Sequence, residues 1–282
     1  MPTTIAIIAA GAMGSAIGRR LHDEGHAITT LLDGRSAATR RRAEAAGMKG
    51  VSATAIVEAD FILSILPPSE ALALAKRLAP EIGRATTKPL YVDCNAVSPE
   101  TMRSIAAVVA PTGASVVDAG IIGGPPKPGG KGPAIYASGP AAERFAGIET
   151  SLDIRRLDGP IGAASALKMC YAGLNKGLIT LESTILLAAV RAGASEALLK
   201  QVGESNPDLL DHLRKNIPTM FDKAYRFKGE MEEIAQFLGA ADPGGRAIYE
   251  GAALFYDRLA ADVAGPRREV GALEGVLRTS AS

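Results

Sequence analysis

Short apolar runs alternate with amphipathic segments through roughly the first 160 residues of the chain. The first run, residues 5–9, leads through glycines into a segment, residues 13–24, of helical length that ends at Gly25. Further strands are expected at residues 26–32, 51–52, 60–66, 89–93, 115–118, 134–138 and 153–157. Runs of this length are typical of buried strands, and their alternation with helices predicts an α/β fold with a Rossmann-type, doubly wound and mostly parallel sheet.

The pattern changes near residue 161, after which no strand signal returns. Residues 163–192 indicate one long helix, in which Gly173 and Gly177 are weak points. Shorter helices are expected at residues 195–203, 206–215, 218–226, 229–238 and 244–264, before a loosely held tail that reaches Ser282. The sequence thus predicts a nucleotide-binding domain over residues 1–162 and an all-helical domain for substrate binding and dimerisation over residues 163–282, joined by the long helix.

The first strand turns into the first helix at Ala9, Gly11 and Gly14. This A-x-G-x-x-G spacing differs from the G-x-G-x-x-G of dinucleotide-binding turns in one small residue, and alone it also fits an ordinary strand–turn–helix unit. In a dinucleotide turn the backbone and the positive helix N-terminus hold a pyrophosphate, and ligands lie beyond the carboxyl ends of the strands. We therefore expect a cofactor to contact Gly11, Ala12, Met13, Gly14, Arg35, Ser36, Leu66, Pro67 and Asn95.

Composition narrows the possible partners. The formal net charge of +1 attracts neither nucleic acid nor an anionic membrane, and the absence of Trp with only 4% aromatic residues argues against base stacking. Cys94 and Cys170 lie far apart and the three histidines lack ligand spacing, so no metal site is expected. No apolar run reaches the roughly 18 residues of a membrane helix. These features predict a cytoplasmic protein without nucleic-acid or membrane partners.

Four motifs occur in a fixed order. After the glycine turn come Asp93-Cys-Asn-Ala-Val-Ser-Pro99, Asp118-Ala-Gly-Ile-Ile-Gly-Gly124 and Gly159-Pro-Ile-Gly-Ala-Ala-Ser-Ala-Leu-Lys168. In this order and spacing the chain resembles the β-hydroxyacid dehydrogenases related to 6-phosphogluconate dehydrogenase, whose motifs are D-x-S-T-x-x-P, D-A-P-V-S-G-G and G-x-x-G-x-G-x-x-x-K-x-x-N-N. The resemblance covers about residues 4–240 and is faint after residue 170, so the helical half looks like a divergent branch.

The resemblance implies that Lys168 is the catalytic general acid and base. It would accept the hydroxyl proton of the substrate as hydride leaves for the nicotinamide, and donate that proton in reduction. A lysine does this near neutral pH only if burial or a positive neighbour lowers its pKa, and a solvated helix lysine is the alternative interpretation. The family asparagine is Ala172 here. We expect Asn175, seven residues after Lys168 and about 20° further round an α-helix, to take over its orienting role.

The substrate side departs from the family pattern. Gly123 and Gly124 match the glycines whose backbone N–H groups bind the substrate carboxylate, but Ile122 replaces the preceding serine and Tyr171 precedes Ala172. These replacements predict a larger or less carboxylate-dependent substrate, in contact with Ile122, Gly123, Gly124 and Tyr171. The loop of residues 123–133, rich in glycine and proline, either lines this pocket or is a stiff surface loop.

Two residues after the second strand point to different cofactors. Asp33 would accept hydrogen bonds from the ribose hydroxyls of NAD, whereas Arg35 would pair with the 2′-phosphate of NADP. Counting back from Gly47, Gly34-Arg35-Ser36 falls on the Asn-Arg-Thr of NADP-dependent relatives. We therefore predict NADP, with NAD as the alternative.

The prediction that results is an NADP-dependent oxidoreductase of a small-molecule substrate, which interconverts a β-hydroxyacid-like alcohol and its oxo form. Imine reduction is an alternative on the same fold: Lys168 counts against it, while Ile122 and Ala172 count for it. A non-catalytic NADP(H) sensor is a third possibility, which the lysine and the glycine pair oppose. The apolar stretch of residues 178–190 further predicts a homodimer in which each helical domain completes the cleft of its partner.

Overall fold

The computed structural model describes residues 3–279, and the chain divides into two compact units, Met1–Met169 and Cys170–Ser282. The boundary falls within the helix α7, Ala163–Ala172. The two units are described separately.

One sheet organises the first unit, with its strands in the order β3-β2-β1-β4-β5-β6-β7-β8. All neighbouring strands are parallel except β6 and β7, which are antiparallel. The doubly wound, mostly parallel sheet expected from the sequence is therefore confirmed. The strands are β1 Thr4–Ile8, β2 Ala27–Thr30, β3 Lys49–Gly50, β4 Phe61–Ser64, β5 Leu90–Asp93, β6 Val116–Ile122, β7 Ala134–Ser138 and β8 Asp153–Arg156.

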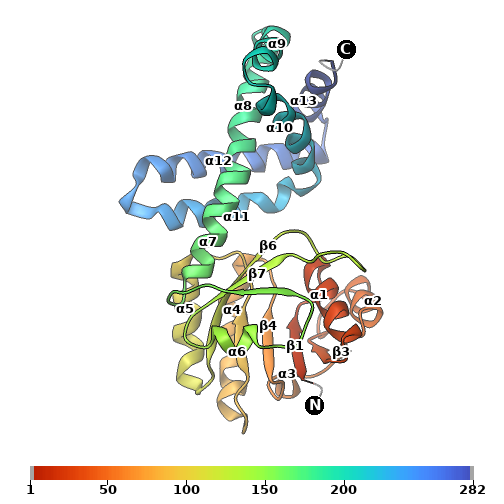
Figure 1. Cartoon of the computed structure of the whole chain (residues 1–282), viewed down its shortest axis with the longest axis vertical. Coiled ribbons are helices and arrows are strands. Elements are labelled where there is room, and N and C mark those ends of the chain that lie inside the picture. The colour runs from red at the N-terminus through yellow and green to blue at the C-terminus, as the bar shows by residue number, and fades with distance from the viewer. Residues whose placement is uncertain (1–2, 280–282) are drawn as a thin grey trace. The chain divides into compact units, whose positions relative to one another are not determined.

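The sheet is covered on both faces because its buried strands are apolar on both sides (Figure 1). In β1, Ile5 and Ile7 belong to the core that includes residues of α1 and α2, whereas Ala6 and Ile8 belong to the core beneath α4 and α5. Such strands are typical of parallel sheets between two helical layers. The helices of this unit are α1 Ala12–Asp23, α2 Ala37–Ala45, α3 Ala53–Ile56, α4 Pro68–Arg84, α5 Pro99–Val109, the 3-10 helix Ala110–Thr112, α6 Ala142–Ala146 and the start of α7.

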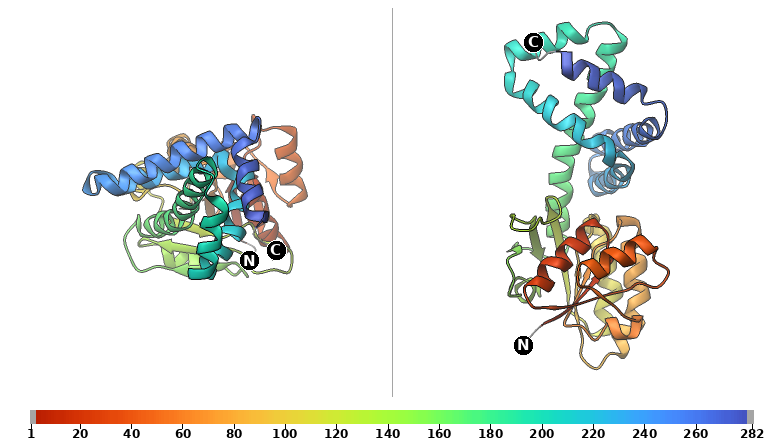
Figure 2. Two further views of the ribbon diagram at one scale, coloured as in Figure 1. Left: turned by 90° about the horizontal axis from the view of Figure 1, so that it is seen from above. Right: turned by 90° about the vertical axis from the view of Figure 1, so that its right-hand side faces the viewer.

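The described part of the second unit is helical, as predicted, and α11 packs along α12 within it (Figures 1 and 2). Tyr256 of α12 lies in the core of this unit, with its ring edge-to-face against Phe227 and Phe255. The elements after α7 are the π-helix Gly173–Gly177, α8 Leu178–Arg191, α9 Ser195–Ser205, α10 Pro207–Asn216, the 3-10 helix Ile217–Lys223, α11 Ala224–Leu238, the 3-10 helix Gly239–Ala241, α12 Pro243–Ala264 and α13 Arg268–Thr279.

Two expectations for this unit are wrong. The tail after Gly265 is not loosely held through residue 279: α13 buries Val270, Leu273 and Leu277, which recur at helical spacing. Its first turn is capped by Asp262, whose carboxylate accepts hydrogen bonds from the backbone N–H groups of residues 268 and 270. The expected separate helices over residues 218–226 and 229–238 are a 3-10 segment followed by α11, which continues through Gly229 because the glycine lies inside a well-packed helix.

The long helix is present as expected, but it contains a π-helical turn at Gly173–Gly177. The whole stretch Ala163–Arg191 is also long and apolar enough to cross a membrane by length and composition alone, with a mean hydropathy of 1.2 over its most apolar 18-residue window. The expectation that no segment reaches this length fails by that measure, because an average tolerates polar residues that interrupt an apolar run. Only 39% of the window is buried within the chain.

Candidate active site

The turn between β1 and α1 has the shape that a dinucleotide turn requires. A Cβ atom on Gly14 would lie 2.1 Å from the carbonyl oxygen of Ala9, so only glycine allows α1 to pack this closely against the turn. A Cβ atom on Gly11 would meet nothing within 4 Å, and no side chain caps the N-terminus of α1 at this residue. The turn therefore offers an open helix N-terminus to an anion, which fits a pyrophosphate.

The loop after β2 brings the predicted Arg35 and Ser36 to the start of α2. The Oγ atom of Ser36 accepts a hydrogen bond from the backbone N–H of Thr39 and so caps this helix. Arg42 of α2 links this loop to the glycine turn. Its Nε donates to the carbonyl oxygen of Ala10 at 3.2 Å, and its Nη2 donates to Thr39 Oγ1 at 3.1 Å.

Asn95 ties together the loops that follow β4 and β5. Its side-chain oxygen accepts a hydrogen bond from the backbone N–H of Leu66, and its amide group donates to Ser64 Oγ at 2.7 Å and to Asp93 Oδ2 at 2.9 Å. Leu66 and Pro67, expected in the cofactor site, are thus held against Asn95 at the carboxyl edge of the sheet. Asn95 has only 3% of its surface exposed, so its contacts set the position of these loops.

A row of polar residues runs across the buried sheet beneath these loops. Ser64, Asp93, Asp118 and Ser138 are register partners on β4, β5, β6 and β7. Burial raises the pKa of Asp93 to about 7; hydrogen bonds from Asn95 and Ser64 oppose the shift, and the charge of Asp118 adds to it. A raised carboxyl pKa at the edge where ligands bind is typical of functional sites, although buried structural networks show it too.

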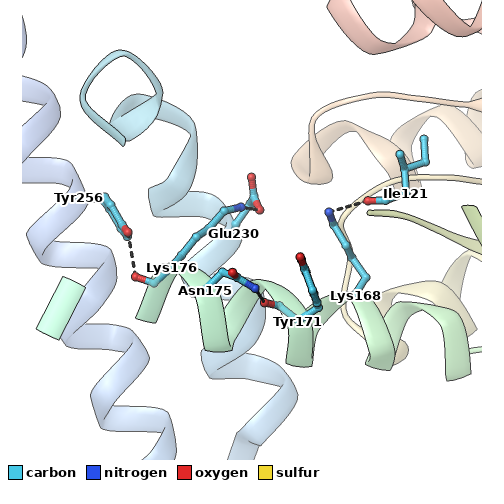
Figure 3. Close-up of polar contacts among 7 residues, drawn as sticks. All are labelled: Ile121, Lys168, Tyr171, Asn175, Lys176, Glu230 and Tyr256. Carbon is cyan, nitrogen blue, oxygen red and sulfur yellow. Dashed lines mark hydrogen bonds and ion pairs between the residues drawn. The ribbon is translucent and has the colours of Figure 1, made fainter. Parts of the chain in front are cut away.

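Lys168 belongs to α7, and its side chain reaches Ile121 near the end of β6, as Figure 3 shows. The side chain is half-buried, and its Nζ donates a 2.6 Å hydrogen bond to the carbonyl oxygen of Ile121. The close approach is possible because β6 has Gly120 where the helix crosses: a Cβ atom there would lie 2.9 Å from the carbonyl oxygen of Ala164 and 3.2 Å from the Cβ of Lys168. The ammonium group is therefore held at the carboxyl edge of the sheet that carries the glycine turn.

The expected carboxylate-binding residues follow immediately. Ile122 ends β6, and Gly123 and Gly124 are exposed just beyond it. Gly123 has φ of 129°, a backbone conformation that favours glycine, and a Cβ atom there would press on Pro133 at 3.1 Å. Ile121 O, which holds Lys168, is thus two residues from the glycine pair.

The loop of residues 123–133 is fixed to α1 rather than free. Arg20 donates from Nη2 to the carbonyl oxygens of Lys127 and Gly130 at 2.9 and 3.0 Å. The loop lines a cavity of about 490 Å³ together with α1 and α2, with Arg19, Arg42 and Lys127 among the lining residues.

Tyr171 and Asn175 belong to the second unit. Both are exposed, and Asn175 Nδ2 donates to the backbone carbonyl of Tyr171 at 2.8 Å (Figure 3). Asn175 lies inside the π-helix, so the 20° offset calculated for an ideal α-helix does not apply to it.

Sequence reasoning missed Lys176, which is partly buried in the second unit and forms an ion pair with Glu230 (Figure 3). Burial lowers the pKa of Lys176, against the opposing effect of Glu230. Its carbonyl oxygen accepts a 2.9 Å hydrogen bond from Tyr256, while Gly173 and Gly177 make room for Tyr249. The two glycines were the available signal for the π-helical turn.

An open helix N-terminus at a glycine turn and a lysine at the same edge of a parallel sheet define the class of NAD(P)-dependent dehydrogenases. Residues 4–153 match the family model described as the NAD binding domain of 6-phosphogluconate dehydrogenase, and the chain belongs to this family. Residues 189–259 match a second model, described as a domain of unknown function (DUF1932). The expected membership and the divergent helical half are both confirmed.

Among proteins of described activity, the chain is 29% identical to the 3-hydroxyisobutyrate dehydrogenase of Pseudomonas aeruginosa over 210 residues, which cover 71% of this chain and 68% of that protein. It is 28% identical, with a TM-score of 0.71, to the structure of a conserved protein described as similar to 3-hydroxyacid dehydrogenases, covering 93% and 98% of the two chains. The chain is thus an NAD(P)-dependent dehydrogenase that is similar to 3-hydroxyacid dehydrogenases.

Two more distant structures share the fold. One is a 3-hydroxyisobutyrate dehydrogenase of Mycobacterium tuberculosis with L-serine, at 21% identity and a TM-score of 0.72, with 100% of both chains covered. The other is an imine reductase of Myxococcus stipitatus in complex with NADP+, at 18% identity and a TM-score of 0.55, covering 98% of this chain and 100% of the other. At these identities the likeness extends to the fold alone.

Proposed function

We propose that the protein is an NADP-dependent oxidoreductase that interconverts a β-hydroxyacid-like alcohol and its oxo form, with Lys168 as general acid and base. The observation that carries this proposal is the 2.6 Å hydrogen bond from Lys168 Nζ to Ile121 O, at the carboxyl edge of the sheet and next to the glycine pair. The dehydrogenase relatives support the same reaction class.

The residues of the first unit fit the chemistry of this reaction. A bound nicotinamide cofactor supplies or accepts the hydride. Ile121 O accepts a hydrogen bond from the Lys168 ammonium group and so positions it, and in reduction this ammonium group would donate a proton to the substrate oxygen. In oxidation the neutral amine accepts the hydroxyl proton. The backbone N–H groups of Gly123 and Gly124 are assigned to an anionic group of the substrate, and Ile122 leaves them without the hydroxyl of a neighbouring serine.

The preference for NADP rests on the loop after β2. Arg35 is half-buried beside the capped start of α2, whereas Asp33 is exposed. A guanidinium at this position pairs with a 2′-phosphate. We expect Arg35→Ala to weaken NADPH binding about tenfold or more and to leave NADH binding nearly unchanged, measured by direct titration. Asp33→Ala is the matched variant; if it weakens NADH binding and Arg35→Ala changes neither, the cofactor is NAD.

Imine reduction remains the second candidate, because Ile122 and Ala172 replace polar residues of the family and an imine reductase shares the fold. A panel of oxo acids and aldehydes, assayed with NADPH in the presence and absence of ammonia or methylamine, separates the two. The proposed function predicts oxidation of NADPH without the amine. Turnover only with the amine would indicate C=N reduction, and tight binding of NADPH without turnover on any carbonyl or imine would indicate a sensor.

The second unit supports a proposal on assembly. Five large apolar residues of the long helix are exposed: Tyr171, Leu174, Leu178, Leu181 and Ile185. Three of them, Leu178, Leu181 and Ile185, lie on α8 at spacings of three and four residues. This spacing is that of a helix seam, which a two-fold axis would pair with itself. We propose that a second copy of the chain covers this stripe in a homodimer. A membrane is the competing occupant for so apolar a face, and it predicts a monomer that partitions into vesicles.

A further inference from the structure

The N-terminus of α7 is capped by residues that lie far away in the sequence. Helices begin with backbone N–H groups that have no partner within the helix, and a nearby side chain usually accepts from them. In α7 the carboxylate of Asp118, on β6, takes this part: its Oδ2 accepts from the N–H groups of Gly162 and Ser165 at 2.9 and 3.0 Å, and its Oδ1 accepts from Ser165 Oγ at 2.6 Å.

A neighbouring strand completes this cap. Ser138, the register partner of Asp118 on β7, donates from Oγ to Asp118 Oδ2 at 3.0 Å and accepts from the N–H of Ala164 at 3.0 Å. Asp118 and Ser138 have no exposed surface, and Ser165 has 1%. The carboxylate also lies at the positive end of the helix dipole, which favours its charge. Four hydrogen bonds thus hold one buried carboxylate in a fixed position.

Three neighbouring positions of β6 together fix α7. Asp118 binds the N-terminus of the helix, Gly120 allows close contact in its first turns, and the carbonyl of Ile121 receives the ammonium group of Lys168. Lys168 comes one turn after Ser165 on the same helix. A shift of α7 along β6 would therefore move Lys168 Nζ away from Ile121 O.

We propose that Asp118 is a positioning residue for the reaction: it fixes α7 on β6 so that Lys168 presents its ammonium group at the edge of the sheet. The inference rests on the proposed role of Lys168 as general acid and base. It assigns to Asp118 no contact with substrate or cofactor. Because misplacement of a catalytic group by about 1 Å can reduce turnover about 100-fold, removal of the anchor has a measurable effect.

The test compares two variants of Asp118. Asp118→Ala removes all four hydrogen bonds, and we expect kcat to fall about 100-fold while the Kd for NADPH is unchanged, because the glycine turn depends on β1 and α1. In Asp118→Asn the amide oxygen can accept the three bonds of Oδ2, and Ser165 Oγ can turn to accept from the amide. We therefore expect this conservative variant to restore most of kcat.

Two further variants keep the test decisive if Asp118→Ala does not fold. Ser165→Ala removes only the hydroxyl bond to Oδ1, and we expect a loss in kcat of about fivefold, the size expected for one hydrogen bond. Ser52→Ala is the matched control: Ser52 caps α3 by accepting from the N–H of Ala55 at 3.2 Å, so its loss should lower the thermal midpoint and leave kcat unchanged.

The outcomes separate this inference from the proposed function. If Lys168→Ala abolishes turnover while Asp118→Ala and Ser165→Ala keep normal kcat, the positioning role of Asp118 is wrong and the proposed function stands. Equal losses of kcat and of NADPH binding in Asp118→Ala would also overturn it, because they indicate a general loss of structure. If Lys168→Ala itself retains turnover, the proposed function fails.

Discussion

The two units differ in the side chains that they place in unusual surroundings: the first buries polar side chains, and the second exposes large apolar ones. The first unit buries a row of polar residues in its sheet and gives this row partners: Asp118 accepts four hydrogen bonds, and Asn95 joins Ser64, Asp93 and the N–H of Leu66. The second unit exposes large apolar residues along one helix, with Leu174 73% and Ile185 60% exposed.

The buried polar row and the exposed apolar stripe have different consequences for the structure. A buried polar group is costly unless its hydrogen bonds are satisfied, so a fully paired row across a sheet fixes one arrangement of the loops and helix above it. An exposed apolar stripe of this length is unusual on a monomer and marks a surface that something covers. The first unit therefore fixes the loops of the candidate site, and the second carries the surface on which we propose that a homodimer forms.

The largest expected effect concerns the exposed stripe. The double variant Leu178→Glu and Leu181→Glu places two charges on each copy of the proposed interface, and we expect it to be monomeric at micromolar concentration, measured by light scattering, while the wild type is a dimer. Tyr225→Glu, which changes an exposed aromatic residue of α11, is the control and should remain dimeric. A wild-type monomer would refute the proposal.

The glycine turn allows a sharper distinction between packing and ligand binding. Gly14→Ala should lower the free energy of unfolding by about 1–3 kcal/mol even without cofactor, because its Cβ collides with the backbone of Ala9. Gly11→Ala should leave this free energy nearly unchanged, since its Cβ meets open space, and should weaken NADPH binding. Thermal or urea unfolding and cofactor titration of both variants check the pair. Equal behaviour of the two would contradict the account.

The buried row of the first unit also predicts a pH dependence of stability due to Asp93. Its folded pKa of about 7 lies above its ordinary value of 3.8, so the folded state binds more protons than the unfolded state between these values. The contribution to stability is present below about pH 4 and is lost as the pH rises to about 7. We expect the wild type to lose a few kcal/mol relative to Asp93→Asn between about pH 5 and about pH 8, in urea unfolding.

Asp153 serves as the control for the sign of this pH dependence of stability. The hydrogen bond from Arg155 lowers the pKa of Asp153, which is exposed on β8. Asp153→Asn should change stability only slightly and in the opposite direction with pH. A pH slope that is the same in Asp93→Asn as in the wild type would show that Asp93 does not carry it.

The features predictable from the sequence are those that depend on neighbouring residues. The apolar period of the strands, the glycine turn and the segment that ends at Lys168 are local signals, and the fold class and family follow from them. The cap of α7 is different: Asp118 lies 47 residues before Ser165, and only the folded sheet brings them together. The positions of Arg42 and Lys176 also depend on the folded chain, since Arg42 donates to the carbonyl oxygen of Ala10 and Lys176 pairs with Glu230. The apolar spacing of Val270, Leu273 and Leu277 is a local signal that indicates α13, whereas a loosely held tail was expected there.

Turnover of Lys168→Ala, measured together with its NADPH affinity, tests the central claim most directly. With the oxo substrate that gives the highest rate in the wild type, we expect kcat to fall about 10²- to 10⁴-fold, the contribution of a positioned general acid, and the Kd for NADPH to stay the same. Wild-type kcat in this variant would contradict the claim that the lysine at the end of β6 carries the proton transfer.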